Sequence, residues 1–150
     1  MKITVYKTRF NENKEIALVK EKSRYFPEIG CVDSQKNCVK MIEELFDASN
    51  LCEEHIWLVA LNGARKVTGV FEVSRGTSTS SLVHPREIFL RAILVGAVSI
   101  ILVHNHPSGV LFISEQDYEV TKRVKAVGEL VGIPLDDHLI IGDFDYVSAI

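Results

Sequence analysis

Two histidines, His104 and His106, stand on either side of Asn105, and Asp117 follows a short distance along the chain. Side chains alternate along a strand, so both imidazoles would face one side at a strand end while Asn105 points away. Two neutral imidazoles and one carboxylate form a three-ligand set suited to catalytic zinc, with one position left for water. Bound zinc can lower the pKa of that water to about 7. We therefore predict one Zn²⁺ per chain, held by His104, His106 and Asp117.

Each of these residues also has an ordinary structural interpretation. A single histidine is usually a hydrogen-bonded structural residue, and Ser114 with Asp117 matches a helix capping box. A hydrophobic strand that ends in His-x-His is costly to bury without partners, however, and the carboxylate follows at a short, fixed distance. The combined pattern therefore favours a metal site over separate structural roles.

The segments around these residues are of the kind that could position them. Residues 98–103 form a continuous apolar run, typical of a strand buried on both faces, and His104 follows it directly. Pro107-Ser108-Gly109 would turn the chain out of the sheet. A helix predicted over residues 114–131 then places Asp117 in its first turn, beside the histidines.

The remaining elements follow from hydrophobic periodicity and turn residues. We predict further helices over 34–48 and 85–95, a loop over 25–33, a hairpin turn at Asn62-Gly63, and further strands over 2–9, 16–20, 54–61, 67–74, 134–141 and 146–149. Strands interleaved with three helices predict an α/β or α+β fold, a three-layer sandwich whose mixed sheet is flanked by helices, with the chemistry at strand ends. No repeat or linker interrupts the chain. We expect one domain over 1–150, in which 1–33 is an N-terminal strand and loop extension.

Composition limits the possible partners and compartment. The chain has 150 residues, 47% of them hydrophobic, and a net charge of −3 with scattered Lys and Arg, so direct nucleic-acid binding is not favoured. Three cysteines are an odd number and predict free thiols in a reducing compartment. The N-terminus lacks the layout of a signal peptide, and the apolar run over 93–103 is too short to cross a membrane. These features predict a cytoplasmic protein without membrane contact.

The sequence also resembles a known family. His104-x-His106, seven residues, Ser114, two residues and Asp117 are similar to the JAMM signature of MPN-domain metallopeptidases. Three strings resemble the RadC family of bacterial JAMM proteins: Ser81-Leu82-Val83-His84-Pro85-Arg86-Glu87, His104-Asn105-His106-Pro107-Ser108-Gly109 and Asp137-His138-Leu139-Ile140-Ile141-Gly142. The resemblance runs from about Ser34 to the C-terminus and implies a JAB/MPN-like fold similar to the cytidine deaminase topology. Without a helix-hairpin-helix module, the chain resembles the short RadC-like proteins.

The resemblance implies a peptidase or isopeptidase that acts on a peptide or protein. JAMM enzymes use a glutamate at the start of the strand after the first helix as the general acid and base. Glu54 stands at that place, and Glu72 is the reserve candidate. By the same comparison Ser114 would donate a hydrogen bond to the oxyanion of the tetrahedral intermediate. His84 and His138 belong to the resemblance but have no assigned ligand role, and we interpret His138 as a structural hydrogen-bonding residue.

The sequence also allows functions other than the hydrolase. RadC-like proteins carry a DNA-repair and mobile-element association, and a non-catalytic, metal-stabilised interaction module is a further alternative. A zinc nucleobase deaminase is disfavoured because its His-x-Glu and Pro-Cys-x-x-Cys patterns do not occur. One departure from the family is the apolar loop Val110-Leu111-Phe112-Ile113, for which we expect an exposed surface that recognises substrate or a partner. The oligomeric state stays open.

Overall fold

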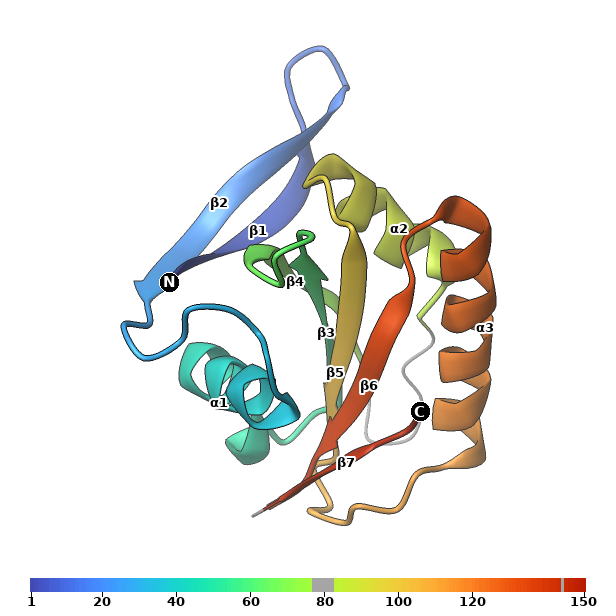
Figure 1. The fold of residues 1–150 in the computed structure, drawn as a ribbon. Helices are drawn as coiled ribbons and strands as arrows, with labels where there is room; N and C mark the ends of the chain where they lie inside the picture. Colours follow the sequence, from blue (N-terminus) through green and yellow to red (C-terminus); the bar gives the residue numbers. More distant parts are fainter. Residues whose placement is uncertain (77–82, 144) are drawn as a thin grey trace.

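The computed structural model describes residues 1–76, 83–143 and 145–150 (Figure 1). Within these residues seven strands form one mixed sheet in the order β2-β1-β4-β3-β5-β6-β7, and three α-helices pack on it. The elements are β1 (Lys2–Phe10), β2 (Ile16–Tyr25), α1 (Gln35–Phe46), a 3₁₀ turn (Ala48–Asn50), β3 (His55–Leu61), β4 (Val67–Arg75), α2 (Pro85–Leu94), β5 (Ser99–Asn105), α3 (Glu115–Val131), β6 (Leu135–Ile141) and β7 (Tyr146–Ser148).

The two faces of the sheet carry separate cores because side chains alternate along each strand. On β3, Trp57 and Val59 belong to the core that also contains Met41 of α1. Ile56 and Leu58 belong to the other core, beneath α2 and α3. Figure 1 shows α1 on one side of the sheet and α2 with α3 on the other. The predicted three-layer α+β sandwich is confirmed.

Strand β5 lies in the interior of the sheet and ends at the predicted site. It pairs antiparallel with β3 and parallel with β6, and six of its seven residues are buried. The ladder continues to the pair Asn105↔Ile141, so the strand ends two residues beyond the predicted 98–103. His104 is therefore a strand residue, paired with Ile56 on one side and Ile140 on the other.

The N-terminal hairpin differs most from the prediction. Strand β2 runs from Ile16 to Tyr25 instead of ending at Lys20, because β1 pairs with it from Lys2↔Tyr25 to Phe10↔Ile16. Its second half is charged and mostly exposed, so it lacks the apolar alternation that marks a half-buried strand. The hairpin joins the sheet through a parallel contact of Val5 with Val70.

Helix starts follow the local sequence. Ser34 caps α1 by accepting a bond from the Asn37 N–H at 3.3 Å. Pro85 opens α2, and His84 caps it because its Nδ1 accepts from the Arg86 N–H at 3.2 Å. His84 therefore has a structural role, while Ser81 and Leu82 of the same string lie outside the described residues. No described helix combines the length and apolar character needed to cross a membrane.

Candidate functional site

The two histidines lie at the end of β5 on the α2 and α3 side of the sheet. His104 is 3% exposed, and His106, the next residue but one, is half-buried. Their ring centroids are 4.6 Å apart and the planes stand at 76°. The alternation of the strand thus brings both imidazoles to one side, as the spacing predicts.

Asp117 reaches both histidines from the first turn of α3. Its Oδ1 lies 3.4 Å from His104 Nδ1 and its Oδ2 lies 3.5 Å from His106 Nε2. Ser114 holds this carboxylate in a capping box: its backbone N–H and its hydroxyl donate to Oδ2 at 2.8 and 2.6 Å. In return the Ser114 hydroxyl accepts from the Asp117 N–H at 3.1 Å. The cap that starts the helix therefore also orients the carboxylate.

The main chain of the following loop fixes the ring of His106. Its Nδ1 lies 2.9 Å from the carbonyl oxygen of Val110, and a carbonyl only accepts, so Nδ1 carries the proton. Nε2 then presents its lone pair toward Asp117. Gly109 makes the turn between the two residues possible, because its φ is +73° and a Cβ there would overlap the carboxylate of Asp143.

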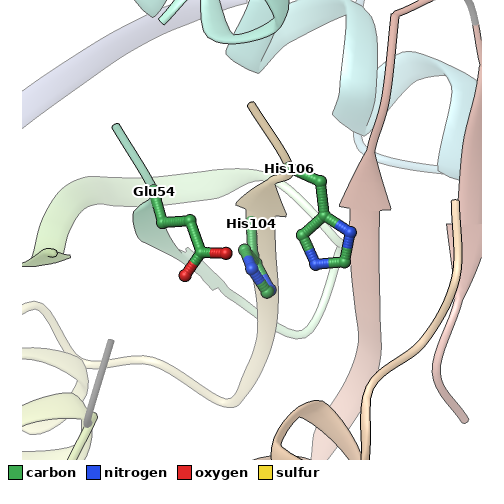
Figure 2. A group of neighbouring side chains, drawn as sticks. All are labelled: Glu54, His104 and His106. Carbon is green, nitrogen blue, oxygen red and sulfur yellow. The ribbon is translucent and has the colours of Figure 1, made fainter. Parts of the chain in front are cut away.

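Glu54 approaches the histidines from the start of β3. Glu54, His104 and His106 each offer a ligand atom, and these atoms lie within 4.8 Å of one another (Figure 2). Asn105, whose side chain faces the other way, clamps the chain around Glu54. Its Oδ1 accepts from the His55 N–H at 2.7 Å and its Nδ2 donates to the Glu53 carbonyl at 3.0 Å. The asparagine between the two histidines thus positions the glutamate.

The ring of His104 has no hydrogen-bond partner for either nitrogen within the part of the chain that the structure describes. Burial lowers the pKa of His104 to about 3, so the imidazole is neutral and one nitrogen carries a free lone pair. Buried polar atoms are nearly always bonded, so an unpartnered pair of nitrogens beside two carboxylates fits a site that could hold a ligand. This donor set of imidazole and carboxylate suits a divalent metal cation.

The two carboxylates differ in protonation. Burial raises the pKa of Glu54, and Asp117 raises it further, while His106 opposes both. Burial would also raise the pKa of Asp117, but His106 and the bonds from Ser114 outweigh it and hold that pKa far below its usual range. The pKa of His106 is in turn raised, chiefly by Asp117. Asp117 is therefore a permanent anion, and Glu54 is the carboxylate better able to carry a proton.

These residues line one pocket of about 330 Å³. The pocket is also lined by the apolar residues Ile56, Val110, Phe112 and Val120. Val110 is 57% and Phe112 72% exposed, whereas Leu111 and Ile113 are half-buried. The loop over 110–113 thus places exposed apolar surface at the mouth of the pocket.

The structure separates the two candidate glutamates. Glu72 lies 3.2 Å from the Nδ1 of His55 and lines a different pocket, with Lys7 and Arg75. Sequence reasoning missed the roles of Asn105, the Val110 carbonyl and Thr121, which bonds His138. Only Asn105 carried a signal, its place between the histidines; a main-chain carbonyl leaves none.

This chain is similar to a described protein family and to several curated proteins. The model of a family described as RadC-like JAB domain matches residues 32–150. A UPF0758 protein of Desulforudis audaxviator is 52% identical over 95 residues, which are 63% of this chain and 41% of that protein. A UPF0758 protein of Clostridium kluyveri is 46% identical over 114 residues, or 76% of this chain and 49% of the relative. The chain therefore spans about half the length of these relatives or less.

Proposed function

This chain belongs to the RadC-like JAB domain family, and on that premise we propose that it is a zinc-dependent peptidase or isopeptidase. The observation that carries the proposal is the buried His104, whose ring nitrogens lack partners among the described residues although two carboxylates stand beside it. A hydrolytic metal site needs such open donors together with a proton carrier. One pocket contains both kinds of residue.

The proposed ligands are His104, His106 and Asp117. His106 is prepared for this role because Val110 holds its proton on Nδ1 and leaves Nε2 free. Asp117 is prepared because Ser114 fixes its orientation and its low pKa keeps it ionised. When bound there, the metal would act as a Lewis acid on a carbonyl and on a water molecule.

Glu54 is the proposed general base and acid. Its carboxylate lies in the same ligand-atom cluster as both histidines, and its raised pKa suits a group that takes a proton and returns it. In amide hydrolysis Glu54 would take the proton of the attacking water and deliver it to the leaving nitrogen. Asn105 contributes by holding the backbone on either side of this glutamate.

Ser114 is the proposed donor to the oxyanion that forms from the scissile carbonyl. Ser114 lines the pocket, and its hydroxyl donates to Asp117 Oδ2 at 2.6 Å. In acting on substrate it would exchange that bond for one to the oxyanion, while its backbone N–H continues to hold Asp117.

The substrate is proposed to be a peptide or protein whose apolar side chain rests on the loop over 110–113. Phe112 and Val110 support this proposal because both are exposed and both line the pocket. Exposed apolar side chains beside a reactive centre commonly carry specificity. The three cysteines are free thiols, which supports a cytoplasmic, reducing location.

The test combines metal analysis with a peptide-library cleavage assay on protein purified without added zinc. We expect about one zinc per chain, cleavage that chelator abolishes, and recovery on addition of zinc. Glu54→Gln should retain the metal and the fold but lose roughly 10²- to 10⁴-fold in turnover, because the amide cannot carry the proton.

Glu72→Gln is the matched control, because Glu72 lies outside the pocket and should leave metal content and turnover unchanged. Normal turnover of Glu54→Gln would contradict the assignment of the acid and base. Stoichiometric metal with no cleavage of any library would instead favour the non-catalytic interaction module.

A further inference from the structure

A second set of hydrogen bonds lies next to the proposed metal ligands and involves Thr121 and His138. Thr121 stands one helical turn after Asp117 on α3, and His138 stands on β6 with 0% exposure. The Thr121 hydroxyl oxygen lies 2.7 Å from the Asp117 carbonyl oxygen and also 2.7 Å from His138 Nδ1. Both contacts are short enough to require a proton between the atoms.

These two contacts determine which nitrogen of His138 carries its proton. The Asp117 carbonyl only accepts, so the single hydroxyl proton of Thr121 must point to it. Toward His138 the same hydroxyl can only accept, and Nδ1 must therefore be the donor. A neutral His138 then has a bare Nε2, with an in-plane lone pair and no proton.

The residue that carries this bare nitrogen belongs to the candidate site. His138 lines the same pocket as His104 and His106, and its Nε2 is fully buried with no partner among the described residues. The nearest imidazole is that of His104: the ring centroids are 5.8 Å apart and the planes are inclined by only 25°. Both nitrogens of His104 are unpartnered as well.

We propose that His138 is a positioning residue for His104, and that its Nε2 accepts a hydrogen bond from the proton-bearing ring nitrogen of His104 through one buried water. A ligating histidine uses one ring nitrogen for the metal and needs an acceptor for the N–H of the other. His138 supplies that acceptor, and Thr121 keeps it free. The observed bonds join the Asp117 carbonyl, Thr121 and His138. The proposed water would extend them to His104 and so connect two of the proposed ligands.

This inference rests on the proposed metal site, and its first test does not involve activity. Nitrogen-15 NMR of the histidine rings in the metal-free, full-length protein reports which nitrogen carries each proton. We expect His138 protonated at Nδ1 and bare at Nε2. Thr121→Val removes the acceptor for Nδ1 and should give a mixture of the two forms. A His138 ring protonated at Nε2 in the unmodified protein would overturn the inference.

The second test measures zinc affinity by competition with a chromogenic chelator. His138→Asn keeps a polar group near Nδ1 for Thr121 but loses the acceptor, and we expect a 10- to 100-fold weaker affinity. His138→Gln places an amide near the former Nε2 and should recover most of that loss. Circular dichroism and thermal unfolding check that both variants fold.

The outcomes separate the two proposals. If the unmodified protein binds no zinc, the proposed function fails and this inference fails with it. If the unmodified protein binds zinc and a folded His138→Asn variant binds equally tightly, the inference alone fails. If neither variant folds, the tautomer in the unmodified protein still decides between a bare and a protonated Nε2.

Discussion

Two polar clusters lie on opposite faces of the same sheet, and pockets of similar size, about 330 and 320 Å³, open on them. On the α1 face Asp136 accepts from Arg65 at 2.9 Å and from Ser99 at 2.7 Å. Asp137 accepts from Gln35, Ser148 and its neighbour's backbone N–H. On the other face, buried ring nitrogens of His104 and His138 lack partners among the described residues.

The difference separates a structural polar cluster from a candidate binding site. In the first cluster both carboxylates are satisfied by donors of this chain, which makes it a tie between α1, the β3–β4 turn and β6. In the second, buried ring nitrogens have no partner among the described residues, although burying unpartnered polar atoms costs free energy. Pocket size and carboxylate number do not separate the two clusters; unmet hydrogen bonding does.

The largest expected effect is the loss of zinc from the cluster that contains the two histidines. His104→Ala combined with His106→Ala should abolish stoichiometric zinc binding, because two of the three proposed ligands are removed. Metal analysis of the purified, folded variant provides the measurement. One equivalent of metal retained by the double variant would place the binding site elsewhere.

The next effect is a loss of stability of the metal-free protein as the pH falls. Burial lowers the pKa of His104 to about 3 and of His138 to about 4, against an ordinary value of 6.5. Below pH 6.5 these two histidines therefore bind protons in the unfolded chain but stay neutral in the folded chain. Because of this difference, the free energy of unfolding of the metal-free protein should fall by roughly 3 kcal/mol or more between pH 6.5 and 4. Urea denaturation with chelator, repeated across this range, measures the slope. His138→Gln should show a shallower slope, and a flat profile for the unmodified chain would contradict the buried neutral histidines.

A smaller effect tests the apolar loop over 110–113, which lies beside the candidate site. Replacing Leu111 and Phe112 together by Ser should raise KM for a susceptible peptide by about tenfold through lost apolar contact. Zinc content should not change, since the bond to His106 comes from the backbone of Val110. An unchanged KM would remove the loop from substrate recognition.

The smallest effect tests the satisfied cluster. Asp136→Asn should lower the unfolding free energy by at most about 1 kcal/mol, because the bond to Arg65 is partly exposed to solvent. Zinc affinity and turnover should match those of the unmodified protein. A loss of metal in this variant would show that the two faces are coupled and that the comparison is too simple.

Much of the fold was predictable because buried elements carry strong patterns. The apolar run before His104 marks a central strand, and Ser34, Pro85 and Ser114 mark helix starts. The second half of β2 was not predictable, because an exposed edge strand is held by backbone pairing rather than by apolar alternation.

The candidate site shows the same division. Side chains with a fixed spacing, such as His104, His106 and Asp117, could be proposed from the sequence, and the structure brings their side chains together. The groups that hold these side chains in place, the Val110 carbonyl and the bond from Thr121 to His138, could not be proposed from the sequence. The Val110 carbonyl is a group that every residue has, and the bond from Thr121 to His138 joins residues whose proximity depends on how α3 packs on β6.

The backbone bond from Val110 to His106 also has an evolutionary consequence. A carbonyl is present whatever amino acid stands at position 110, so the loop over 110–113 can change its side chains while the orientation of the histidine is inherited intact. Gly109 makes the required turn directly before this loop. Such an arrangement lets the exposed side chains of the loop change in a lineage while the candidate site beside it keeps its geometry.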